Sequence, residues 1–133
     1  MEAESGVRSG ISVLVVDDDA GAREALGRIL PVRFPGVAVF LAEDGAEGLA
    51  SFQKHRHEIV ITDLSMSRGD GTWMAAEIRK MSPRVAVIAI TAHTSGPCLV
   101  EAGNAGISHI LKKPLNLKEL LGILDKLVAA PRG

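Results

Sequence analysis

The sequence is poor in the residues that build disulfide frameworks, membrane spans and aromatic recognition surfaces. Its 133 residues include one cysteine, one tryptophan, three phenylalanines and no tyrosine. The single cysteine, Cys98, permits no internal disulfide, which favours a reducing compartment. No apolar run approaches the roughly 20 residues of a membrane-spanning helix, and residues 1–10 lack the apolar stretch of a secretory signal. We therefore predict a cytoplasmic protein that does not engage a membrane.

The chain also lacks an excess of either charge. Lysine and arginine number 15, aspartate and glutamate number 16, and the formal charge is -1. Proteins that bind nucleic acid usually carry a strongly basic face, so this balance predicts no direct contact with nucleic acid. The length suits a single domain with its own core. We expect a poorly ordered segment at 1–10, one domain at 11–130 and a tail at 131–133.

Apolar runs of strand length alternate with segments of helical periodicity. The expected strands are Ile11–Val16, Val37–Leu41, Glu58–Asp63, Val85–Ile90 and Ile107–Leu111. The expected helices are Ala20–Leu30, Gly45–Lys54, Gly71–Met81, Pro97–Ala102 and, after a cap at Asn116, residues 117–130. Strands that are apolar on both faces indicate a parallel sheet covered by helices on both sides. Five such units predict an α/β, flavodoxin-like, doubly wound sheet of order 2-1-3-4-5 in three layers.

Local signals set the expected ends of several helices. Pro31, followed by Pro35-Gly36, is expected to end the first helix, and Asp44 is expected to cap the second. The fourth helix begins at Pro97 and is followed by a glycine-rich stretch, which weakens helical structure by about 0.5–1 kcal/mol per interior glycine. We expect this helix to be short or mobile.

Polar side chains stand at the ends of four of these strands. Asp17-Asp18-Asp19 follow the first strand, Asp63 ends the third, Thr91 follows the fourth, and Lys112-Lys113 follow the fifth. In open α/β sheets, ligands bind at the carboxyl ends of the strands. In the order 2-1-3 the first and third strands are neighbours, so the carboxylates of Asp17, Asp18 and Asp63 are expected to converge.

Three converging carboxylates need a cation, because like charges raise one another's pKa. Carboxylate oxygens beside a phosphoryl group suit Mg²⁺, and Mn²⁺ can serve as well. The alternative interpretation is that Asp17, Asp18 and Asp19 only cap the first helix, a role expected of Asp19 in any case.

Four motifs in this order resemble the receiver domain of two-component response regulators. They are Val15-Val16-Asp17-Asp18, Asp63 with Asp70-Gly71, Ile90-Thr91-Ala92, and Lys113-Pro114. The resemblance extends over about residues 11–130. It implies a domain that takes a phosphoryl group from a histidine kinase or a histidine phosphotransfer protein. It also implies that the domain then switches a partner or an output domain and catalyses only its own phosphorylation and dephosphorylation.

The resemblance assigns Asp63 as the phosphoacceptor. Asp18, Asp63 and the backbone carbonyl of Ser65 would bind Mg²⁺ directly, and Asp17 would bind through a water molecule. Arg23 lies six residues after Asp17, a spacing common in the family, which favours Asp17-Asp18 as the acidic pair.

The resemblance also implies that Thr91 and Lys113 each contact a phosphoryl oxygen. Lys112 would point to the other face, since successive strand residues alternate, and the Lys113–Pro114 peptide would be cis. Formally, Mg²⁺ and Lys113 balance three carboxylates, so an acyl phosphate of about -2 would leave a net charge near -1. The resemblance further allows a dimer through the fourth helix, fifth strand and fifth helix.

The chain departs from the family at two positions. Ser67 replaces a common proline, and Ile110 stands where receivers usually have tyrosine or phenylalanine as a switch residue. His109 cannot substitute, because a shift of one residue places it on the opposite face of the strand. We therefore expect switching to run through Thr91 and the fourth helix, with Ile110 in place of the aromatic residue. The resemblance also makes His93, two residues beyond Thr91, a candidate modulator of the access of water to the acyl phosphate.

Other interpretations compete with this one. Asp17-x-Asp19 fits the DxD motif of haloacid-dehalogenase-like phosphatases, but that interpretation leaves Asp63 unexplained. A receiver-like domain used only as a binding surface is a second alternative. His55 and His57 are interpreted as surface residues rather than metal ligands, Trp73 and Met74 as packing residues, and Cys98 as no nucleophile.

Overall fold

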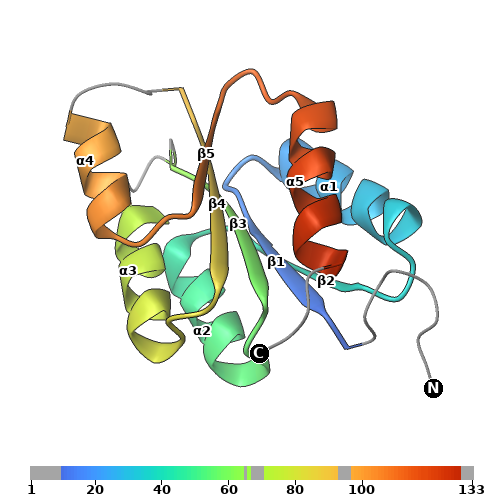
Figure 1. The fold of residues 1–133 in the computed structure, drawn as a ribbon, viewed down its shortest axis with the longest axis horizontal. Helices are drawn as coiled ribbons and strands as arrows, with labels where there is room; N and C mark the ends of the chain where they lie inside the picture. The colour runs from blue at the N-terminus through green and yellow to red at the C-terminus, as the bar shows by residue number, and fades with distance from the viewer. Residues whose placement is uncertain (1–9, 65, 67–70, 93–96, 130–133) are drawn as a thin grey trace.

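The computed structural model describes residues 10–64, 66, 71–92 and 97–129, which form an alternating series of strands and helices (Figure 1). The strands are β1 (Ser12–Val16), β2 (Ala38–Ala42), β3 (Ile59–Asp63), β4 (Ala86–Thr91) and β5 (His109–Lys112). The helices are α1 (Ala20–Arg33), α2 (Gly45–His55), α3 (Gly71–Met81), α4 (Pro97–Asn104) and α5 (Leu117–Ala129). Every element predicted from the sequence is present, with ends displaced by up to three residues.

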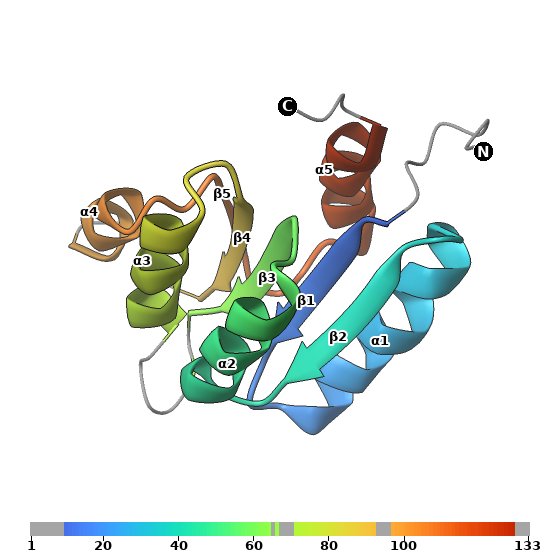
Figure 2. The ribbon, with the colours of Figure 1, turned by 90° about the horizontal axis from the view of Figure 1, so that it is seen from below.

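All the strands pair in parallel, in the order β2-β1-β3-β4-β5. The predicted flavodoxin-like topology is therefore confirmed. Helices α1 and α5 cover one face of the sheet, while α2, α3 and α4 lie on the other (Figure 2). This arrangement gives the three layers that the apolar strands predicted.

Each face of the sheet has its own buried cluster. Val13 and Val15 pack toward α1 and α5, whereas Leu14 and Val16 pack toward α2 and α3. Because β1 is an interior strand that is covered on both faces, its residues Val13 to Val16 are all apolar. On α5, Leu120 and Leu124 are buried against the same face of the sheet as α1.

The prediction that Pro31 ends the first helix is wrong. Helix α1 continues through Arg33, and the backbone N–H of Phe34 donates to the carbonyl of Leu30 over 2.8 Å. Proline removes one helical hydrogen bond, but Leu30 and Phe34 flank it and are both buried. Burial of these two side chains stabilises the last turn despite the proline.

Helix α4 is short, as predicted, although it runs to Asn104 rather than Ala102. Its C-terminus has the two hydrogen bonds of a Schellman motif, from Gly106 N–H to the Gly103 carbonyl and from Ile107 N–H to the Ala102 carbonyl. Gly106 has a φ of +82°, a backbone conformation that residues other than glycine rarely adopt. Whether α4 is also mobile stays a prediction.

Two predictions about individual side chains are wrong. His57 is 2% exposed, because its ring lies between the hydroxyls of Ser12 on β1 and Ser51 on α2. Trp73 was interpreted as a packing residue, but it is 47% exposed on the first turn of α3, where the adjacent Met74 takes the buried position. His55 is exposed, as predicted, and Asp44 caps α2 by accepting from Glu47 N–H.

Candidate functional site at the carboxyl ends of the strands

The turn between β1 and α1 carries three aspartates and is tied down by several hydrogen bonds. Asp17 N–H donates to the Ala42 carbonyl at the end of β2, and Asp17 Oδ1 accepts from Asp19 N–H over 2.9 Å. Asp19 Oδ1 accepts from Gly21 N–H, so the predicted cap of α1 is confirmed. These contacts leave Asp17 and Asp18 to face the end of β3.

Asp63 is held at the end of β3 by the close approach of α3. A Cβ atom added to Gly71 would lie 2.9 Å from the Asp63 carbonyl oxygen, so only glycine allows the helix to begin there without a shift. The hydroxyl of Thr62 donates to the same carbonyl, and Leu64 N–H donates to Ile90 on β4. The Asp63 side chain is 4% exposed.

Asp17, Asp18 and Asp63 converge as the sequence predicted. One carboxylate oxygen from each lies within 4.8 Å of the others. Asp17 and Asp63 are buried, while Asp18 is exposed. Burial raises the pKa of Asp17, and the negative charges of Asp63 and Asp18 raise it further. A set of hard oxygen donors with one open side fits Mg²⁺, which keeps part of its water shell.

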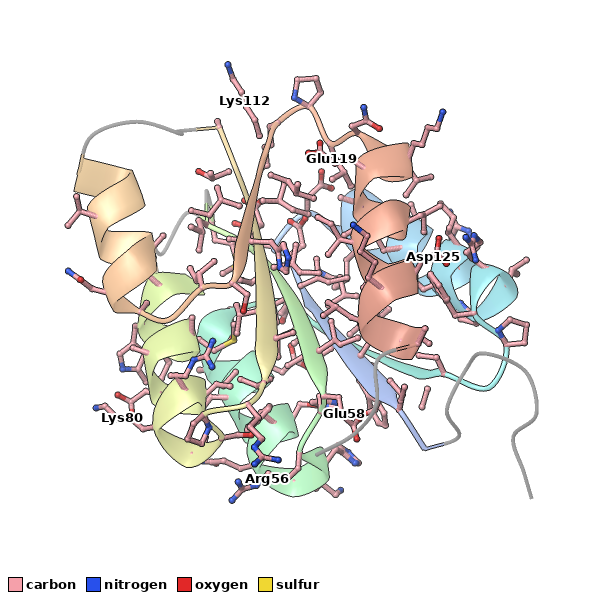
Figure 3. The ribbon with its side chains drawn as sticks, viewed as in Figure 1. Arg56, Glu58, Lys80, Lys112, Glu119 and Asp125 are labelled. Atoms are coloured by element: carbon pink, nitrogen blue, oxygen red, sulfur yellow. The ribbon has the colours of Figure 1, made fainter. Side chains whose placement is uncertain are left out.

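Lys113 supplies the positive charge in the cluster. Its Nζ atom donates to Asp63 Oδ2 over 2.8 Å, and this hydrogen bond is the main reason that the pKa of Lys113 is raised. Lys113 N–H also donates to the Thr91 carbonyl, and the Lys113–Pro114 peptide is cis, as predicted. Lys112 is exposed and points away from the sheet (Figure 3). Of the two lysines, Lys113 is the one that contacts Asp63.

Thr91 completes the described part of the site. It is the last residue of β4, is 3% exposed and pairs with Lys112 in the sheet register. Ile110 pairs with Ala89 and is partly buried. Ser65, Ser67 and His93 lie outside the described residues.

Arg23 makes a contact that the sequence did not predict. Its guanidinium donates to the backbone carbonyl of Asp17 over 2.8 Å. In the sequence, the spacing of six residues between Asp17 and Arg23 indicates only which two aspartates form the acidic pair. The contact itself depends on how α1 leaves the turn, which no sequence pattern specifies.

A cavity of about 420 Å³ opens beside this cluster, between α1 and the segment that joins β5 to α5. Its lining includes Asp17, Asp19 and Lys113 together with apolar side chains of α1 and α5, among them Leu26 and Leu117. The acidic cluster therefore borders a concave apolar surface.

Comparison with known proteins identifies the family. The family model described as the response regulator receiver domain matches residues 13–125. The chain belongs to this family. Receiver domains are signalling domains of two-component systems, and this membership leaves the phosphatase interpretation without support. The match begins within β1 and ends within α5.

Named relatives agree with this assignment. The chain is 40% identical over 113 residues to the transcriptional regulatory protein GlrR of Escherichia coli K12, covering 85% of this chain and 25% of GlrR. It is 36% identical over 118 residues to the response regulator MprA of Mycobacterium sp. strain KMS, covering 89% of this chain and 50% of MprA. The chain thus spans a quarter to a half of these relatives. Because GlrR is named a transcriptional regulator, the predicted lack of contact with nucleic acid finds no support here.

Solved structures show the same fold. The chemotaxis protein CheY4 of Vibrio cholerae superposes with a TM-score of 0.79 at 30% identity, covering 88% of this chain and 98% of CheY4. A receiver domain from Colwellia psychrerythraea superposes with a TM-score of 0.82 at 23% identity, covering 90% of this chain and 99% of that structure. Among the described residues, no helix is long and apolar enough to cross a lipid bilayer.

Proposed function

We propose that this domain accepts a phosphoryl group on Asp63 from a phosphohistidine of a histidine kinase or phosphotransfer protein. In this step the P–N bond of phosphohistidine breaks, a P–O bond to an Asp63 carboxylate oxygen forms, and the histidine leaves with a proton. The observation that carries the proposal is the contact of Asp63 with Lys113 beside Asp17 and Asp18. Phosphoryl transfer depends mainly on positioning and on neutralising negative charge.

The proposal gives each side chain a physical role. Asp17, Asp18 and Asp63 would hold Mg²⁺ or Mn²⁺, together with the Ser65 carbonyl, and Asp17 would bind through water. The cation would supply positive charge for the incoming phosphoryl oxygens. Lys113 already donates to Asp63 Oδ2 and would donate to a phosphoryl oxygen instead. Thr91, at the end of the neighbouring strand, would donate its hydroxyl to another.

The consequence of phosphorylation is proposed to run through α4 rather than through an aromatic side chain. Ile110 is β-branched and stiff at χ1, so it does not rotate in and out as tyrosine would. Thr91 would move toward the phosphoryl group and draw the start of α4 with it, and His93 would tune the access of water. The domain at 11–130 would then switch an output domain or partner in the cytoplasm, with α4, β5 and α5 as a possible dimer surface.

Intact-protein mass spectrometry tests the assignment of Asp63. After treatment with phosphoramidate and Mg²⁺, the protein should gain one phosphoryl group, and omission of the metal should abolish the gain. Asp63→Asn should remove it. Asp19→Asn is the matched control, since asparagine caps a helix as well as aspartate does, and it should be labelled normally. Labelling that persists in Asp63→Asn would refute the proposal.

A further inference from the structure

We infer that Arg23 is a positioning residue for the metal-binding aspartates, acting through the peptide unit that joins Asp17 to Asp18. The inference rests on the proposed function, because it concerns the affinity of the acidic cluster for Mg²⁺. The guanidinium of Arg23 binds the backbone from which two of these carboxylates project.

The guanidinium of Arg23 donates to the Asp17 carbonyl over 2.8 Å. This oxygen belongs to the planar peptide between Asp17 and Asp18, so the hydrogen bond fixes the orientation of the whole plane. The direction of the Asp17 and Asp18 side chains depends on that orientation. A carboxylate that projects from a fixed plane meets a metal ion with less loss of conformational entropy.

Arg23 holds the turn at a second point. Its backbone N–H donates to the Asp19 carbonyl over 3.0 Å, as the first full helical hydrogen bond of α1. Asp17 N–H is bound to Ala42 and Asp17 Oδ1 to Asp19 N–H. The turn is therefore anchored to β2 on one side and to α1 on the other. Of the two bonds from residue 23, only the side-chain bond to the Asp17 carbonyl requires arginine.

Helix energetics alone do not explain an arginine at this position. Arg23 is the fourth residue of α1, near the positive end of the helix dipole, where a cation is unfavourable. Its side chain is also half-buried, whereas Arg28 on the same helix is exposed. The contact with the Asp17 carbonyl gives this half-buried side chain a hydrogen-bond partner.

A positioning role and a purely electrostatic role predict opposite changes in Mg²⁺ affinity when Arg23 is removed. If Arg23 acted only through its charge, its removal would tighten Mg²⁺ binding, because a competing cation would be lost. If Arg23 holds the turn, its removal weakens Mg²⁺ binding, since the carboxylates must then be ordered by the metal. The direction of the change therefore decides between the two.

The test is an NMR titration of the whole chain with Mg²⁺, following backbone amide shifts. Arg23→Met keeps the apolar stem and removes both the donor and the charge. We expect its affinity for Mg²⁺ to fall about tenfold, a loss typical when a group that orients metal ligands is removed. Arg23→Lys keeps a donor and should recover part of the loss, while Arg28→Met, on the exposed face, should match wild type.

Hydrogen exchange of the same amides gives a readout that charge alone does not move. In metal-free Arg23→Met, the amides of Asp18 and Asp19 should exchange faster, while those of β3 remain protected. Unchanged or tighter Mg²⁺ binding in Arg23→Met, or an Arg23→Lys variant no better than it, would overturn the inference. A wild-type chain that binds no Mg²⁺ would instead contradict the proposed function.

Discussion

Lys113 Nζ lies 2.8 Å from Asp63 Oδ2, although Asp63 ends β3, Lys113 follows β5, and β4 lies between these two strands. The contact is possible because Lys113 reaches back across the end of β4, where its N–H is bound to the Thr91 carbonyl. The lysine side chain is 37% exposed, whereas the carboxylate is 4% exposed. The buried carboxylate of Asp63 is thus paired with a partly exposed ammonium group of Lys113, which has room to move toward a phosphoryl group on Asp63.

The first prediction separates the two adjacent lysines. Lys113→Ala should slow phosphorylation by phosphoramidate by about 10- to 100-fold, because a hydrogen bond to a charged group contributes roughly 1.5–3 kcal/mol. Mg²⁺ binding should be unchanged or tighter in this variant, since a competing cation is lost. Lys112→Ala is the control and should be near wild type, because Lys112 is exposed. Labelling rates that fall for Lys112→Ala instead would contradict the role given to Lys113.

The second prediction concerns Gly106, which follows the C-terminus of α4. Gly106→Ala should destabilise the protein by about 1–3 kcal/mol, because its φ is +82° and an added Cβ would lie 2.6 Å from Arg79 Nε. Arg79 also donates to the Gly106 carbonyl, so it has little freedom to withdraw. Urea unfolding measures the change.

Gly122→Ala is the matched control for that measurement. Gly122 lies within α5, and nothing is within 4 Å of an added Cβ. The substitution should stabilise the protein by about 0.5–1 kcal/mol, as expected in a helix interior. Equal changes in stability for the two substitutions would show that the positive φ of Gly106 does not make alanine unfavourable there.

The fold was predictable because its signals are local or periodic. Val13 to Val16 are apolar at successive positions, which only a strand covered on both faces requires. The order of strands then brings Asp17, Asp18 and Asp63 together without any further information. The convergence of these three aspartates therefore follows from the strand order.

The features that were not predicted depend on tertiary packing rather than on local sequence rules. His57 appears in the sequence as a histidine beside a helix end, and its partner Ser12 lies 45 residues earlier. Pro31 should end a helix by local rules, yet the buried neighbours Leu30 and Phe34 extend it. Trp73 and Met74 are adjacent apolar residues, and the helix phase that buries Met74 is fixed by packing.

The third prediction tests the proposed path of the signal. Hydrogen exchange should change most over 92–106 when the Mg²⁺-bound form is compared with a beryllofluoride-bound form that mimics the phosphoryl group. The described part of this segment includes the short helix α4, in which Val100, Gly103 and Asn104 are exposed. Short segments with little buried surface reorder at a low cost in free energy. Changes confined to the chain between Asp63 and Gly71, with equal protection at 92–106, would contradict this path.

The last prediction concerns the buried His57. Burial is the main cause that lowers its pKa from 6.5 to about 4, and the nearby His55 lowers it further. Its ring nitrogens lie 3.1 Å from the Ser12 hydroxyl and 2.9 Å from the Ser51 hydroxyl, so the neutral ring is held between β1 and α2. The unfolded chain, with the ordinary pKa, binds a proton at this residue between pH 6.5 and 4, whereas the folded chain does not.

Folding free energy should therefore decrease as the pH falls from about 6.5 toward 4, by at most about 1.4 kcal/mol per pH unit from this residue. The stabilisation is complete above pH 6.5. His57→Gln should be less stable than wild type at pH 7.5 but should lose less stability on acidification, as urea unfolding at pH 7.5, 6 and 5 would measure. His55→Gln, at an exposed neighbour, should keep most of the wild-type dependence. If the unfolding free energies of wild type and His57→Gln change in parallel with pH, His57 has the same pKa in the folded and unfolded states and the prediction is wrong.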